Sequence, residues 1–149
     1  MRFLFLVLIF FTEIASAETP EPSDCMEEAK TQIELNRCAA LELKNAKSEM
    51  ERVFQEILKK YADDPVFVEK MKIAQDTWAK YRDAQIEMQF PHSDQAQYYG
   101  SIYPLCLQLE LTRFTQERIK VLNKWLVGIE EGDICGGSIK VKSQLPTEN

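Results

Sequence analysis

Histidine and glycine are scarce in this chain of 149 residues, and each scarcity excludes a class of chemistry. The one histidine, His92, belongs to no Ser-His-Asp order, so a hydrolytic triad is not indicated. The glycines form no phosphate-binding loop, because Gly136-Gly137-Ser138 follows no strand pattern and precedes no helix pattern. Carboxylates are abundant, but no pair stands out with a glycosidase-like separation. We therefore predict a protein that is not an enzyme and needs no cofactor.

Two further absences limit the partners. No Cys-x-x-Cys pair is present, so with a single histidine the usual zinc-ligand spacings are missing, and we predict no metal. No basic stripe is present either, and the formal net charge is −6 at pH 7. This balance argues against nucleic acid and favours a basic partner, mainly by speeding encounter.

Long apolar runs are also lacking. The main one, Phe3 to Phe11, is shorter than the about 20 residues that a membrane-spanning helix needs. It follows Arg2 and precedes the small-x-small site Ala15-Ser16-Ala17, which is typical of a signal peptide. We therefore expect residues 1–17 to be cleaved after Ala17 and the protein to reach a bacterial periplasm or the cell exterior. No cysteine stands at the cleavage site, so we expect no stable membrane anchor.

Apolar residues instead recur every three or four positions in three segments, at about 31–61, 65–90 and 104–127. Thr31 and Glu34 fit a capping box at the start of the first segment, and Asp64-Pro65 fits the start of the second. Gly128 is a natural end for the third. The sequence predicts an all-α fold, a small antiparallel bundle of three long helices. Residues 18–30 form a leader or short helix, 31–127 the helical domain and 128–149 an irregular tail.

The stretch 74–84, A-Q-D-T-W-A-K-Y-R-D-A, is the expected centre of the bundle, with Trp78 and Tyr81 in the core. Polar residues of all three helices lie at a similar depth from one end of the bundle. We predict that they meet in one structural layer that fixes helix register. The layer residues are Glu34, Asn36, Arg82, Asp83 and Arg113.

Three motifs together resemble the LprI-type lysozyme-inhibitor family of small secreted bacterial proteins. They are T-Q-I-E-L-N-R-C-A from residue 31, the 74–84 stretch, and C-L-Q-L-E-L-T-R from residue 106. The resemblance implies an α-helical, disulfide-braced domain in the envelope or outside the cell, with lysozyme as its protein partner. The chain departs from the family pattern at Ile86, where members commonly have cysteine, and at Tyr99, where they commonly have glycine.

Cysteines number four, all beyond the expected cleavage site, and an even count in an exported protein indicates two disulfides. Cys38 and Cys106 lie at similar depth in the predicted bundle, which favours a Cys38–Cys106 bond with Cys25–Cys135 as the second. A Cys25–Cys38 bond stays open as an alternative.

The resemblance implies that the protein binds and inhibits lysozyme, and we expect it to do so by occluding the active-site cleft. We predict that the loop between the second and third helices makes the contact, since tyrosines are good interface anchors. The alternative is a non-inhibitory envelope protein that binds another periplasmic protein or a cell-wall fragment. The predicted contact residues are His92, Ser93, Tyr98, Tyr99, Ser101 and Tyr103.

Overall fold

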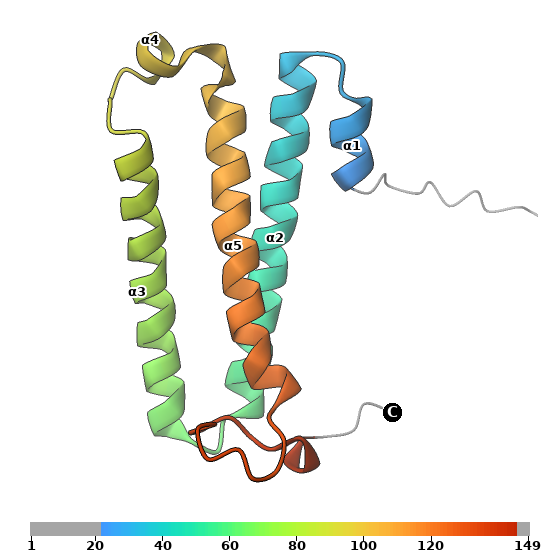
Figure 1. The fold of residues 1–149 in the computed structure, drawn as a ribbon, viewed down its shortest axis with the longest axis vertical. Coiled ribbons are helices and arrows are strands. Elements are labelled where there is room, and N and C mark those ends of the chain that lie inside the picture. The colour runs from blue at the N-terminus through green and yellow to red at the C-terminus, as the bar shows by residue number, and fades with distance from the viewer. Residues whose placement is uncertain (1–21, 146–149) are drawn as a thin grey trace, which may run out of the picture.

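The computed structural model describes residues 22–145, and side chains from residue 25 onward. The expected signal peptide and most of the leader lie outside these residues. The described chain is helical and holds no strand, which confirms the predicted all-α bundle of three long helices (Figure 1). The helices are α1 (Pro22–Glu28), α2 (Gln32–Lys60), α3 (Pro65–Gln89), α4 (Gln95–Tyr99) and α5 (Tyr103–Val127), with short 3-10 helices η1 (Gly100–Ile102) and η2 (Lys142–Gln144). None of these helices is both long and apolar enough to cross a membrane.

The predicted helix ends are found where the sequence places them. Thr31 and Glu34 form the full capping box of α2, with the Thr31 hydroxyl accepting from the Glu34 amide at 3.2 Å. The Asp64 carboxylate accepts from the Phe67 amide at 2.9 Å, and Pro65 opens α3. Gly128 ends α5 with φ of 76°, a conformation that favours glycine. These caps join residues only a few positions apart in the sequence, so the sequence predicts them without knowledge of the tertiary packing.

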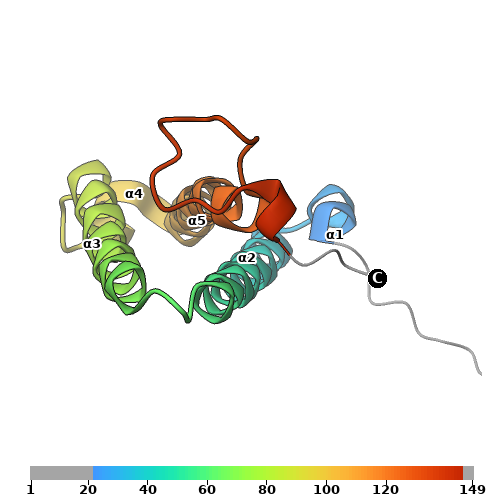
Figure 2. The same cartoon turned by 90° about the horizontal axis from the view of Figure 1, so that it is seen from below.

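The core lies between α2 and α5, which contact each other along most of their length. Val53 and Ile57 of α2 and Leu122 of α5 are fully buried at its centre. From α3, Phe67 and Met71 join this cluster. Seen from below, α3 forms one side of the bundle and α2 the other, with α5 between them (Figure 2).

Only the first turns of α3 are built into this core. No residue from 72 to 89 is buried, and Tyr81 is 55% exposed. Trp78 is half-buried. Tyr81 meets α5 through an edge-on arrangement with the Phe114 ring, with 6.3 Å between the ring centroids. The prediction that Trp78 and Tyr81 are core residues is therefore wrong for Tyr81 and holds in part for Trp78. Periodicity shows which residues share a helix face but not how closely a neighbouring helix covers it.

The disulfide joins Cys25 to Cys38, with a Cα–Cα distance of 5.6 Å. The favoured pairs Cys38–Cys106 and Cys25–Cys135 are wrong, and Cys106 and Cys135 are free thiols. The reason is that α1 folds back beside the start of α2 (Figure 1), so Cys25 meets Cys38 before α5 is reached. The alternative that the sequence left open is the one formed.

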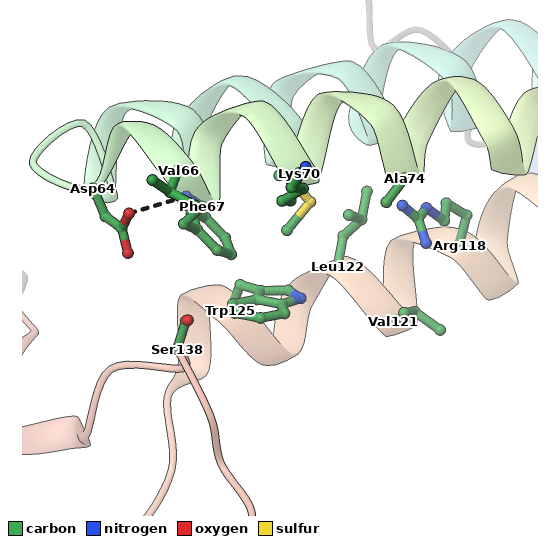
Figure 3. A pocket seen from close by; sticks show the side chains of 11 residues that line it. Asp64, Val66, Phe67, Lys70, Ala74, Arg118, Val121, Leu122, Trp125 and Ser138 are labelled. Carbon is green, nitrogen blue, oxygen red and sulfur yellow. Dashed lines mark hydrogen bonds between the residues drawn. The ribbon is translucent and has the colours of Figure 1, made fainter.

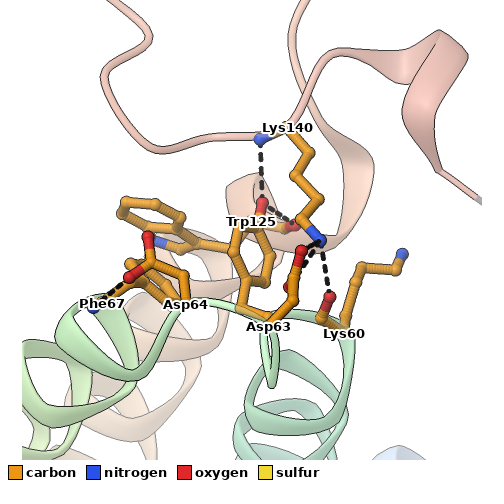
Figure 4. Close-up of polar contacts among 7 residues, drawn as sticks. Lys60, Asp63, Asp64, Phe67, Trp125 and Lys140 are labelled. Carbon is orange, nitrogen blue, oxygen red and sulfur yellow. Dashed lines mark hydrogen bonds and ion pairs between the residues drawn. The ribbon is translucent and has the colours of Figure 1, made fainter.

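The tail folds against the lower end of the bundle without help from Cys135. The Lys140 amide donates to the Tyr61 hydroxyl at 3.0 Å, and that hydroxyl donates to the Trp125 carbonyl at 3.0 Å (Figure 4). The Lys140 ammonium reaches the Lys60 carbonyl at 2.9 Å and the Asp63 carboxylate at 3.0 Å, and lowers the pKa of that carboxyl. The tail is thus held by Lys140 rather than by a disulfide.

Candidate functional site

The connection between α3 and α5 is folded into short helices rather than an open loop. Its residues 90–103 are called the tip here. The Asp94 carboxylate accepts from the Gln97 amide at 3.1 Å and so caps α4. Gly100, with φ of 69°, then turns the chain into η1 and on to α5. The tip stands at the end of the bundle opposite the tail (Figure 1).

Aromatic rings brace the tip from inside. The Phe90 ring lies edge-on to the rings of Tyr99 and Tyr103, with centroid distances of 5.3 Å and 5.2 Å. Tyr103 is buried, with 9% of its surface exposed. The Tyr99 hydroxyl accepts from the His92 amide at 3.1 Å, which fixes the chain just after α3. These contacts hold the tip in one shape.

The outer side of the tip presents one ring stack. The Tyr98 ring lies flat on the His92 imidazole, with 3.9 Å between centroids and 8° between planes. Tyr98 is 58% exposed, and His92, Ser93 and Ser101 are exposed as well. The stack offers a flat aromatic surface with the Tyr98 hydroxyl and the His92 ring nitrogens at its edge. The two serines add hydroxyl donors beside it.

The six predicted contact residues therefore divide into two groups. Tyr99 and Tyr103 mainly build the tip, whereas the other four reach solvent and are free to meet a partner. Sequence reasoning missed Phe90 and Asp94. Asp94 could have been found, because an acidic residue just before Q-A-Q-Y-Y is a typical helix N-cap. Phe90 has no such signal, because its ring meets those of Tyr99 and Tyr103 only after the chain has turned.

The predicted polar layer is not formed as one network by the five residues assigned to it. The Arg82 guanidinium pairs with its neighbour Asp83 at 2.7 Å. Arg113 pairs with Glu110 and Glu117 of its own helix, which raises the pKa of its guanidinium.

The other two layer residues are engaged near the start of α2. Glu34 accepts from the backbone amides of Lys30 and Thr31, which lower the pKa of its carboxyl. The Asn36 amide oxygen accepts from Gln32 at 2.9 Å. The layer prediction is wrong because similar depth along the bundle does not bring side chains onto facing sides of their helices.

A different polar connection does join the three long helices. The Arg118 guanidinium of α5 donates to the Gln75 side-chain oxygen at 2.9 Å, and the Gln75 amide reaches the Met50 sulfur of α2 at 3.5 Å. The same guanidinium lies 5.8 Å from the Trp78 ring centroid. Gln75 and Trp78 both come from the central stretch, so this stretch does tie helices together, through other side chains than expected.

Most of the chain is similar to a known protein family. Residues 23–122 match the family described as lysozyme inhibitor LprI. No curated protein and no solved structure gives a significant match. The matched region covers α1 to most of α5, including the disulfide and the tip, and stops before the tail. Since it spans more than half of the sequence, the chain belongs to the LprI lysozyme inhibitor family.

Proposed function

We propose that this protein is exported and inhibits a lysozyme by inserting the tip into the active-site cleft of the enzyme. Family membership supports lysozyme as the class of partner and an inhibitor rather than an enzyme. The observation that most supports the tip as the contact surface is the exposed Tyr98–His92 stack, which rests on the packed rings inside the tip.

The shape of the tip suits a cleft. A tyrosine in a fixed rotamer gives a large contact area and loses little conformational entropy on binding. The packing of Tyr99 and Tyr103 on Phe90 provides that rigidity. A protruding element can enter a groove that a flat surface cannot.

The chemistry of the tip also suits this target. Lysozyme acts through two carboxyl groups that flank the scissile bond. The Tyr98 hydroxyl, the His92 imidazole and the Ser101 hydroxyl are donors that can pair with carboxylates. The net charge of −6 would speed encounter with a basic lysozyme.

The test is a cell-wall lysis assay with the purified, oxidised protein and its Tyr98→Ala variant. We expect the wild type to inhibit, and Tyr98→Ala to weaken inhibition about tenfold or more, as for a central interface anchor. Tyr81→Ala is the matched control, because Tyr81 has a similar exposure, 55% against 58%, but lies on α3 away from the tip. The melting temperatures of both variants should stay close to that of the wild type.

Two results would count against the proposal in different ways. Unchanged inhibition by Tyr98→Ala would reject the tip as the contact surface while leaving inhibition intact. Absence of inhibition by the wild type at large molar excess, over several lysozyme types, would instead favour an envelope protein that binds another periplasmic protein or a cell-wall fragment.

A further inference from the structure

A pocket of about 560 Å³ lies between α3, α5 and the tail (Figure 3), and no residue of the tip lines it. Its walls are mostly apolar, with Phe67, Met71 and Ala74 on the α3 side and Leu122 and Trp125 on the α5 side. Its size falls within the range of small-molecule sites in proteins, roughly 300–1,000 Å³.

The mouth of this pocket exposes apolar surface to water. Val66 is 65% exposed and Val121 is 47% exposed, and both line the pocket. Covering such a lining with an apolar group is favourable, and the free energy falls in proportion to the apolar area removed from water. The pocket is therefore suited to an apolar guest that enters from the side.

One end of the pocket carries an uncompensated cation. Arg118 is half-buried there, and burial lowers the pKa of its guanidinium. Its side chain contacts are with the neutral Gln75 amide and the Trp78 ring, and within residues 25–145 it forms no ion pair. The arginines that do form ion pairs in this part of the chain, Arg52, Arg82 and Arg113, each pair with a carboxylate of their own helix. A partly desolvated guanidinium without a counter-ion favours an anion.

The two ends of the pocket differ in charge, and this difference would orient an amphiphilic guest. Figure 3 shows Asp64 and Ser138 at one end and Arg118 at the other, with Trp125 and Leu122 between. The Asp64 carboxylate is occupied as the cap of α3 and would repel an anion. Lys70 also lines the pocket on the α3 side, but its ammonium already pairs with the Glu69 carboxylate at 3.8 Å, so Arg118 is the lining cation without an ion pair in the described residues. An anionic head group fits at Arg118, and an apolar chain fits along the wall towards Asp64.

From this arrangement we propose that the pocket binds a single-chain amphiphile with a carboxylate head group, a fatty acid, with its carboxylate on Arg118 and its chain along Met71, Leu122 and Trp125. The site is distinct from the tip and does not depend on lysozyme inhibition.

The experiment is calorimetric titration of the full protein with dodecanoate below its micelle concentration, compared with dodecanol and hexanoate. Dodecanoate should bind about tenfold more tightly than dodecanol, because a charged hydrogen bond at Arg118 distinguishes them. Hexanoate should bind at least about tenfold more weakly than dodecanoate, because its chain covers less of the apolar wall.

The variant Arg118→Met keeps the apolar stem and removes the charge. It should bind dodecanoate and dodecanol alike, whereas Arg113→Met should keep the preference for the acid, since Arg113 is an exposed arginine of the same helix outside the pocket. Equal binding of the acid and the alcohol by the wild type would overturn the proposal, and that comparison stands even where the Arg118 variant fails to fold. A preference for the acid that survives in Arg118→Met would overturn it as well.

Discussion

At the scale of single residues, Tyr61 connects more of the molecule than any motif in the sequence indicates. It ends α2, its ring lies 4.5 Å from that of Phe67 in α3, and its hydroxyl joins the Trp125 carbonyl to the Lys140 amide. Only 1% of its surface is exposed. One hydroxyl thus serves α5 and the tail at the same time, in a place with little access for water.

Removal of that hydroxyl is predicted to destabilise the fold. Tyr61→Phe keeps the ring packing but leaves the Lys140 amide without its acceptor and the Trp125 carbonyl without its donor. The free energy of unfolding, measured by urea denaturation, should fall by about 1–3 kcal/mol. Tyr81→Phe is the control and should change the free energy of unfolding little, because Tyr81 is 55% exposed and its hydroxyl forms no hydrogen bond with the described residues. Equal effects of the two variants would show that the Tyr61 bonds contribute nothing net.

Residue-scale prediction from the sequence succeeds where partners are close in the chain. The Thr31–Glu34 capping box, the Asp64 cap and the Gly128 end are all read correctly, because each involves a few consecutive residues. The hydrogen bonds of the Tyr61 hydroxyl span 64 and 79 residues, and no local pattern encodes them.

At the scale of elements, α3 is the part that the sequence describes least well. Its apolar spacing predicts a helix packed along its whole length, and the helix itself is present from Pro65 to Gln89. Its buried residues, however, are Phe67 and Met71 alone. Periodicity fixes the type of an element, whereas the degree of its burial depends on how far its neighbours lie, which the sequence does not state.

This uneven packing predicts uneven protection of α3. Amides in residues 78–89 should exchange with solvent deuterium at least about tenfold faster than those around Phe67 and Met71 in the same helix, because local opening there exposes little apolar surface. Amides near Val53 and Ile57 of α2 should be the slowest. Hydrogen exchange followed by mass spectrometry of peptides measures this directly. Uniform protection along α3 would mean that its outer half is stabilised by contacts beyond those seen here.

The same limit explains the disulfide and the polar layer. Both predictions used depth along the bundle, which helix lengths give correctly, to decide which side chains meet. Contact also requires that the helices turn the right faces to each other, and the fold-back of α1 beside α2 changes which cysteine lies nearest to Cys38. The tip was located correctly because a connection between two antiparallel helices must lie at their common end.

At the scale of the whole molecule, our proposals assign separate tasks to the two ends of the bundle. The family match covers residues 23–122, which include the tip, and the tail lies beyond it. The tail closes the opposite end through Lys140 and supplies Ser138 to the pocket. Under these two proposals, fold stability and ligand binding at one end of the bundle are separable from partner contact at the other end.

A chain ended after Gly128 tests this separation. It keeps the residue that terminates α5 but loses the bonds of Lys140 to Tyr61, Lys60 and Asp63. Its free energy of unfolding should drop by about 2–4 kcal/mol, because several partly buried polar groups lose their partners together. Its helix content by circular dichroism and its inhibition of lysozyme, measured below its own melting temperature, should stay within about twofold of the full chain, since the tip rests on Phe90 and Tyr103 rather than on the tail. Loss of inhibition with helix content retained would place part of the contact surface on the tail and contradict the assignment to the tip.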